Sequence, residues 1–252
     1  MEYRIERLDE NSWRMEEYDA VNSAYFYLLT GTAQALLLDT GFGTLDVRAI
    51  VQTLTPLPLV VVNSHGHFDH IGANYQFPEV FLHPADEPLY RLHRGRLPHS
   101  HPMTEQLRPL AEGQVFDLGG RTLEVVEAPG HSLGSVCLLD RERRWLFTGD
   151  TCCKADVLLC LEYSGTVAQY AAAIHKLQGL RDRFDLTWPS HHAVPVAPDI
   201  LDQFAQGADL LLQGKDLGRP YPTPFGTFTR LGWKDIGIVY KEGMLEPGEK
   251  EA

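Results

Sequence analysis

The stretch Asn63-Ser64-His65-Gly66-His67-Phe68-Asp69-His70 is the most informative part of the sequence, because four residues of metal-ligand type fall within six positions. It follows directly on the apolar run Leu57–Val62, which predicts a buried strand. Imidazole and carboxylate groups are the ligands that zinc-like divalent ions prefer. The first two histidines are two residues apart, so their side chains share one side of an extended backbone. The stretch therefore predicts a metal site at a strand end, with Asp69 and His70 at the start of a helix.

The same arrangement occurs three more times along the chain. Each time an apolar run ends, and a short turn with a histidine or an aspartate follows. The turns are Ala128-Pro129-Gly130-His131, Thr148-Gly149-Asp150-Thr151 and Pro189-Ser190-His191-His192. Because open α/β sheets gather their ligand sites at the carboxyl ends of strands, we expect these turns to contribute to the same site. The candidates suffice for two metal ions that share a carboxylate.

Length and composition set the class of protein. The chain has 252 residues, a formal charge of −12, 11 histidines and 4 cysteines. This length fits a single α/β domain, predicted to span residues 1–252. The acidic balance argues against nucleic acid and anionic membranes as partners, and no apolar run approaches the ~18 residues of a membrane helix. The charged N-terminus indicates no signal peptide, and the cysteines lack framework spacing, so we expect reduced thiols and a cytoplasmic location.

Strands and helices both alternate and cluster, which predicts an α/β or α+β class with layered sheets. The predicted strands are Ala24–Leu29, Ala35–Leu38, Leu57–Val62, Arg121–Glu127, Ser135–Leu139, Arg144–Phe147 and Phe184–Trp188, with a hairpin at Gly226–Arg230 and Ile236–Tyr240. The predicted helices are Thr44–Leu54, Pro84–Leu92, Thr166–Leu180 and Pro198–Leu212. Residues 94–109 are predicted to form an irregular loop. We expect His93, His99 and His101 to be solvated there or to line a substrate entrance.

The ordered motifs HGHFDH, PGHS, TGDT and PSHH resemble those of the metallo-β-lactamase fold superfamily over most of residues 20–240. The resemblance implies a four-layer αββα sandwich with a metal centre between two sheets. It implies that His65, His67 and His131 hold one ion, and that a second group holds the other. That group is Asp69, His70 and His191, with Asp150 bridging both ions. His191 is preferred because the family's last histidine follows a proline and one small residue, and His192 is the alternative.

The resemblance implies a zinc hydrolase, with iron or manganese as other metals, that acts on a small molecule. A metal-bound hydroxide would attack an ester, lactone, thioester, amide or phosphoester, with Asp69 and His191 as catalytic residues. Asp150 and His70 resemble the glyoxalase II and lactonase groups, whereas B1-type lactamases place a cysteine at the aspartate position. The sequence after Asp150 lacks the GCGR-like stretch of glyoxalase II, which weakens a glutathione-thioester interpretation. A mononuclear iron persulfide dioxygenase keeps HxHxDH and stays an alternative.

Three further expectations concern single residues. Ser132 lies in a GxSxG match, Gly130–Gly134, but an apolar run follows where a serine-hydrolase elbow needs a helix, so a turn residue is favoured. Asp39 is expected to support the site by hydrogen-bonding a ligand or its backbone. Tyr163 is a candidate for contact with the substrate oxyanion. The apolar segment Val157–Leu161 is expected to cover the pocket or to form a subunit contact in a homodimer.

Besides a metal-dependent enzyme and a serine hydrolase, a third class of protein is an alternative. This is a binding protein without catalytic activity on the same fold.

Overall fold

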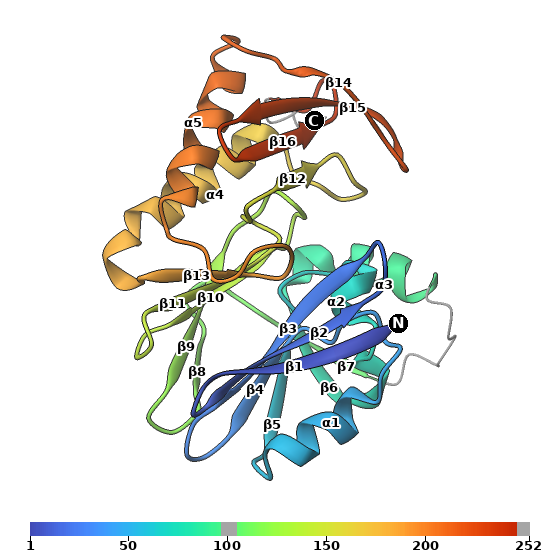
Figure 1. Cartoon of the computed structure of the whole chain (residues 1–252), viewed down its shortest axis with the longest axis vertical. Coiled ribbons are helices and arrows are strands. Elements are labelled where there is room, and N and C mark those ends of the chain that lie inside the picture. Colours follow the sequence, from blue (N-terminus) through green and yellow to red (C-terminus); the bar gives the residue numbers. More distant parts are fainter. Residues whose placement is uncertain (97–104, 246–252) are drawn as a thin grey trace. The chain divides into compact units, whose positions relative to one another are not determined.

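The computed structural model describes residues 1–96 and 105–245. They form two compact units, the first made of residues 1–126 and 138–143 and the second of residues 127–137 and 144 onward. Helices and several separate sheets occur in the chain, which confirms the predicted mixed α/β class (Figure 1). The prediction of a single domain over residues 1–252 stays a prediction. In the described part of the chain, no helix has the length and apolar character needed to cross a membrane.

The first unit is built on a seven-stranded sheet in which the strands follow one another in sequence order. They are β1 (Glu2–Asp9), β2 (Ser12–Tyr18), β3 (Ser23–Thr30), β4 (Ala35–Leu38), β5 (Leu59–Val62), β6 (Glu79–Leu82) and β7 (Gln106–Pro109). Pairing is antiparallel from β1 to β4 and parallel from β4 to β7. Parallel neighbours need a crossover connection, and these crossovers carry the helices of this unit.

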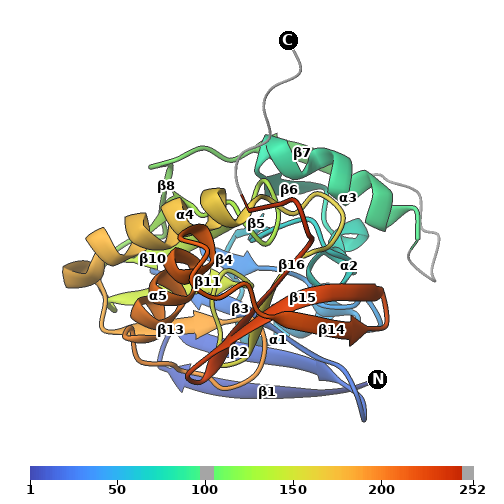
Figure 2. The same ribbon diagram turned by 90° about the horizontal axis from the view of Figure 1, so that it is seen from above.

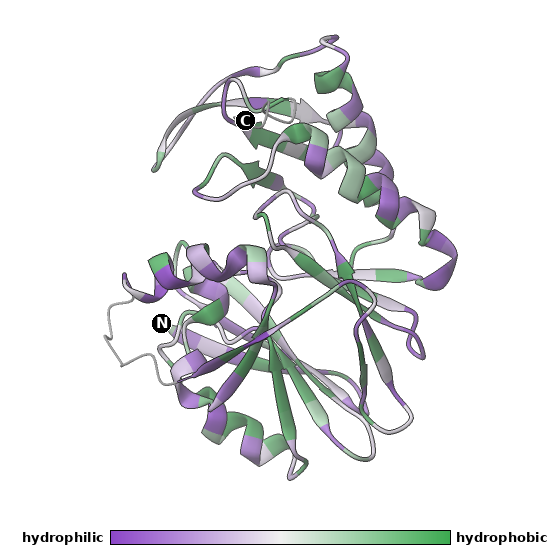
Figure 3. Ribbon diagram, turned by 180° about the vertical axis from the view of Figure 1, so that it is seen from behind, coloured by the Kyte–Doolittle hydropathy of each residue, from purple (hydrophilic) through white to green (hydrophobic). Residues whose placement is uncertain are grey.

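Helix α1 (Val47–Leu54) covers part of this sheet. Its N-cap is Asp46, whose carboxylate accepts a hydrogen bond from the Ala49 N–H at 2.9 Å. Val47 and Val51 are buried in a core with Phe26 and Leu37, and the inner strands are largely hydrophobic in Figure 3. The helix starts three residues later than predicted, because the preceding turn is held by other hydrogen bonds.

The remaining helices and strands of the first unit are short. Helix α2 (Phe68–Ile71) follows β5, and η1 (Asn74–Gln76) precedes β6. After β6 come η2 (Pro84–Asp86) and α3 (Glu87–Arg94). The hairpin β8 (Val115–Asp117) and β9 (Thr122–Glu127) is antiparallel, and β10 (Val136–Asp140) is divided between the two units. The predicted loop 94–109 is wrong at both ends, because α3 includes Arg94 and residues 106–109 pair with β6 as β7. Residues 97–104, with His99 and His101, lie outside the described residues.

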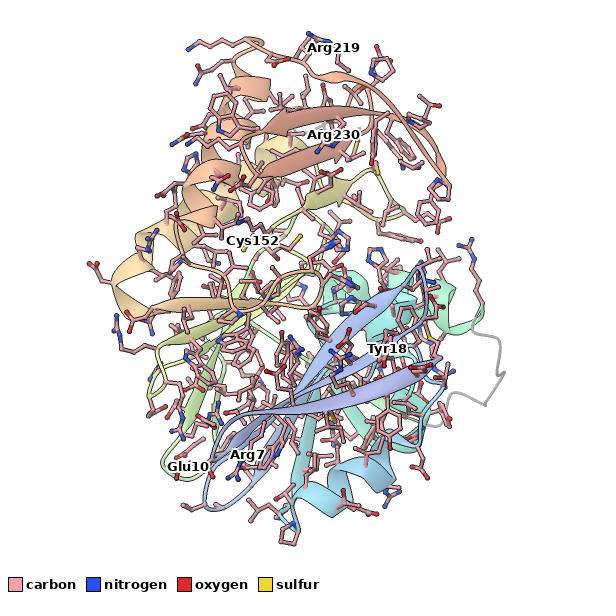
Figure 4. All side chains as sticks on the ribbon, in the orientation of Figure 1. Arg7, Glu10, Tyr18, Cys152, Arg219 and Arg230 are labelled. Carbon is pink, nitrogen blue, oxygen red and sulfur yellow. The ribbon has the colours of Figure 1, made fainter. Side chains whose placement is uncertain are left out.

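In the second unit, β11 (Trp145–Gly149) pairs in parallel with β13 (Leu186–Pro189). A four-stranded sheet has the order β12 (Asp156–Leu159), β16 (Ile236–Tyr240), β15 (Gly226–Trp233) and β14 (Arg219–Thr223). Arg230, labelled in Figure 4, makes two 2.7 Å hydrogen bonds to Asp156 and so ties β15 to β12. Helices α4 (Val167–Gly179) and α5 (Ile200–Leu212) lie side by side (Figure 2), and η3 (Arg181–Arg183) follows α4.

The predicted helices and most strands are confirmed to within a few residues. The exceptions are strands for which the sequence analysis makes no prediction, namely β1, β2, β6, β7, β8, β12 and β14. The segment predicted at Val157–Leu161 to cover a pocket or contact a subunit is mostly strand β12. Val157 and Leu159 are buried and the strand pairs with β16, so these two side chains belong to the unit's interior, whereas the pocket cover or subunit contact stays a prediction.

Candidate metal centre

The first candidate cluster, which we call the motif cluster, contains His65, His67, Asp69 and His70 of the first unit. Strand β5 ends at Val62, and α2 begins at Phe68 as expected. The four residues therefore lie in the short turn after β5 and in the first turn of α2. The ligand atoms of His65 lie within 4.8 Å of those of His67 and of His70. His70 Nε2 lies 3.8 Å from Asp69 Oδ2. The three histidines are buried, so the imidazoles have fixed positions.

Hydrogen bonds on Nδ1 orient two of these histidines. His70 Nδ1 lies 2.9 Å from Asp39 Oδ2, and His65 Nδ1 lies 3.0 Å from Ser64 Oγ. Asp39 also accepts from the backbone N–H and the hydroxyl of Ser64, both at 2.7 Å. With Nδ1 engaged in this way, Nε2 is the nitrogen that each ring can offer to a metal. The expected hydrogen bond between Asp39 and a candidate ligand is therefore present, and its role in supporting a metal site stays a prediction.

On helix α3, His93 packs near Gly66, which differs from the expectation that it lies in a loop. His93 belongs to α3 rather than to a solvated loop, and its Nδ1 accepts a hydrogen bond from the Phe68 N–H at 3.0 Å. Its ring lies 5.1 Å from that of His67. A Cβ at Gly66 would approach Tyr90 N to 3.0 Å, so glycine permits α3 to pack this closely. In the sequence, the four-residue spacing of Leu89 and His93 is the pattern that indicates that His93 belongs to the same helix.

The second candidate cluster, which we call the Asp150 cluster, lies in the second unit. It contains His131, which follows β9, Asp150, which follows β11, and His191, which follows β13. Asp150 Oδ2 lies 3.5 Å from His131 Nε2 and 3.4 Å from His191 Nε2. His131 Nδ1 is hydrogen-bonded to the Leu158 carbonyl at 2.9 Å, so this nitrogen carries the proton and Nε2 faces the carboxylate.

His192, the alternative to His191, follows in the left-handed backbone conformation with φ of 66°. It is His191 that belongs to a group of side chains able to hold an ion. The assignment of individual ligands to individual ions stays a prediction.

The cysteines that follow Asp150 are poor alternatives as ligands. None of the four cysteines forms a disulfide bond, as predicted, and all four are buried. Burial raises the pKa of Cys152 and of Cys153 well above the usual thiol value, which keeps both protonated. The Cys153 thiol points to the Asp156 carbonyl at 3.9 Å. Cys152 is labelled in Figure 4.

Ser132 does not form a nucleophile elbow. The element after it is strand β10, whereas the elbow needs a helix. Its hydroxyl lies 2.8 Å from that of Ser135, within the turn that carries His131. Tyr163 lies beyond β12 with an exposed ring and φ of 61°, and its contact with substrate stays a prediction.

The chain belongs to the metallo-beta-lactamase superfamily, whose family model matches residues 20–184. It is 32% identical over 202 residues to the acyl-coenzyme A thioesterase MBLAC2 of Gallus gallus, which covers 68% of this chain and 73% of the relative. It is 28% identical over 254 residues to the hydroxyacylglutathione hydrolase of Rippkaea orientalis, which covers 90% of this chain and 92% of that protein.

Solved structures show the same fold. The metallo-beta-lactamase from Pontibacter korlensis matches with a TM-score of 0.67 at 19% identity, covering 82% of this chain and 99% of that one. The DIM-1 metallo-beta-lactamase matches with a TM-score of 0.64 at 17% identity, covering 83% and 97%. The protein is therefore an enzyme of a hydrolase superfamily, and its histidine and aspartate clusters have the chemistry to bind divalent metal.

Proposed function

We propose that this enzyme is a binuclear zinc hydrolase that cleaves the thioester or ester of a small molecule. Two relatives support the choice of substrate class, because an acyl-coenzyme A thioesterase and a hydroxyacylglutathione hydrolase both act on thioesters. The observation that carries the proposal is the placement of Asp150. One carboxylate oxygen lies at similar distances from the Nε2 atoms of His131 and His191, which suits a ligand shared by two ions.

In this proposal one ion is held by His65, His67 and His131. The other is held by Asp69, His70 and His191, and Asp150 is shared between them. The donor set fits, since it consists of imidazoles and carboxylates with hydrogen-bonded partners that fix several of the rings. When bound, such ions lower the pKa of coordinated water toward ~7 and polarise a carbonyl oxygen.

The chain's own residues then perform three tasks. The Asp69 carboxylate is partly exposed, unlike the three buried histidines of the motif cluster, so it is the group that can accept a hydrogen bond from an attacking water and orient it. Asp39 keeps the His70 ring in one orientation. The Leu158 carbonyl does the same for His131.

The deciding experiment measures metal content and substrate turnover together. Apoprotein loaded with zinc, manganese or iron is tested against acyl-coenzyme A esters, S-acylglutathiones, lactones, β-lactams and phosphodiesters. Thiol release can be followed with a chromogenic disulfide, since the protein's own four thiols are buried. We expect close to two zinc ions per chain and fastest cleavage of thioesters or esters. A single bound iron with oxygen-dependent turnover, or chelator-resistant hydrolysis, would contradict the proposal.

Three further assignments belong to the same proposal. We infer that residues 1–252 act as one catalytic domain, since the family model runs from the first unit into the second. We infer a cytoplasmic location, which four cysteines without a disulfide bond favour. A homodimer that binds neither nucleic acid nor membrane remains our expectation, and sedimentation of the pure protein would test it.

A further inference from the structure

A buried carboxylate on β2 makes four hydrogen bonds to one turn of the chain. Glu17 is 0% exposed. Its Oε2 accepts from the backbone N–H groups of Phe42 at 2.6 Å and Gly43 at 3.3 Å. Its Oε1 accepts from the backbone N–H of Thr44 at 3.0 Å and from the Thr44 hydroxyl at 2.6 Å. Three successive N–H groups thus converge on one side chain that is 25 residues or more away in sequence.

The turn is shaped to receive this anion. Successive N–H groups that point to one place form an anion-binding concavity. Gly41 and Gly43 have φ of 67° and 82°, a conformation that favours glycine. A Cβ at Gly41 would lie 2.0 Å from Glu17 Oε2, so the carboxylate fills the space that a side chain would need. A buried carboxylate requires hydrogen-bond donors, and here three backbone N–H groups and the Thr44 hydroxyl supply them.

The same turn holds the helix that carries His70. The Thr40 N–H donates to the His70 carbonyl at 2.8 Å, and the Gly72 N–H donates to the Gly41 carbonyl at 2.8 Å. A Cβ at Gly72 would lie 2.1 Å from the Phe42 carbonyl carbon, so the two segments are in direct contact. Asp39, at the start of the turn, holds the His70 ring through Nδ1.

We propose that Glu17 is a positioning residue for the metal ligand His70. It fixes the turn 40–44, and the turn fixes both the backbone of α2 and, through Asp39, the orientation of the His70 ring. This inference rests on the proposed function, because it assigns His70 to the second ion. No motif in the sequence marks Glu17, since three of its four donors are backbone N–H groups.

The test compares Glu17→Gln with two other variants of the full chain. The glutamine side chain has nearly the same shape as glutamate, but it carries no charge and turns one acceptor into a donor that faces N–H groups. Thr44→Val is a milder variant at an exposed position, which removes one donor and keeps the backbone N–H. Glu79→Gln is the matched control, because it removes a carboxylate from the exposed pair with Arg108 on the same sheet.

Two measurements are made on each variant. Zinc titration reports the two binding steps separately. Nitrogen NMR of the metal-free, histidine-labelled protein reports the His70 ring, assigned with His70→Gln. For Glu17→Gln we expect the first ion to bind as in wild type and the second about 10-fold or more weakly. The His70 ring signals should shift or broaden while those of His175 stay unchanged. Thr44→Val should show the same changes to a smaller extent, and Glu79→Gln none.

The outcomes separate this inference from the proposed function. Unchanged His70 signals in Glu17→Gln, or equal weakening of both ions, would overturn the positioning role. A wild-type chain that fails to bind two ions, or that hydrolyses neither thioesters nor esters, would contradict the proposed function instead. In that case the NMR spectra of the metal-free protein still decide whether Glu17 positions His70.

Discussion

Asp150 is the residue on which the proposed chemistry most depends, since one of its oxygens faces two imidazoles at 3.4 and 3.5 Å. Asp150→Ala would remove the ligand that we propose both ions share. We expect metal content and hydrolysis to fall together, with zinc affinity at least about 100-fold weaker. Replacing a residue that only hydrogen-bonds to a metal ligand lowers metal affinity by up to about 100-fold, so loss of a ligand itself should cost at least as much. Metal analysis and turnover of the best substrate measure this.

Ser132→Ala is the matched control for the turn that carries His131. It removes the contact with the Ser135 hydroxyl, which costs about 1 kcal/mol of stability. Hydrolysis should stay near the wild-type rate. A loss of activity in Ser132→Ala comparable to that of Asp150→Ala would instead support a serine nucleophile.

At the scale of elements, one buried ion pair joins the start of β9 to the end of β10. Arg121 and Asp140 are 1% and 0% exposed, and Arg121 also donates to the Asn11 carbonyl at 2.7 Å. Arg121→Met leaves Asp140 buried without its cation, which should cost about 3–5 kcal/mol of unfolding free energy. Denaturant unfolding measures it. Arg108→Met, in an exposed pair, should cost only about 0–1 kcal/mol.

The contact between α4 and α5 should depend on pH. His175 Nε2 lies 3.0 Å from Asp209 Oδ1, and this hydrogen bond raises the pKa of His175 above its usual value near 6.5. Because the folded pKa is the higher one, this stabilisation is complete below the unfolded pKa and is lost as pH rises through the folded pKa.

At pH values below about 6, His175→Gln should therefore lower the thermal unfolding midpoint slightly. At about pH 9 the same substitution should leave the midpoint unchanged. The effect is small because both side chains are nearly half exposed. Asp209→Asn should behave in the same way, and an equal loss at both pH values would contradict the prediction.

For the whole molecule, the prediction concerns removal of metal. A ligand that binds the folded state and is present at about 1,000 times its dissociation constant stabilises it by about 4 kcal/mol. Since the proposed ligands come from both units, chelation should lower the unfolding temperature of both, as seen by calorimetry. The Asp150→Ala protein should show no such response to a chelator. Unfolding that is insensitive to chelation in the wild type would argue against a tightly bound centre.

Residue order alone is enough to identify the family and to name candidate metal ligands. HGHFDH and the three later turns are contiguous patterns, in which strand ends and ligand residues are adjacent in the chain, so residue order alone reveals them. The amphipathic pattern predicts helix α4 to within one residue at each end, and in the structure Thr166 forms a capping box with Gln169 at its start. The supporting role of Asp39 was also foreseen, since it too follows an apolar strand.

The contacts that Glu17 and His93 make with the backbone near the candidate ligands appear only once the chain is folded. Glu17 and His93 lie 25 residues or more from the residues they bind, and each acts on a backbone N–H, which every residue but proline carries. Such contacts leave no residue-type signal in the sequence. The start of α1 was misplaced for the same reason, because Glu17 binds Thr44 from a separate strand. Ligand identity is local in the chain, whereas ligand orientation depends on contacts between distant segments.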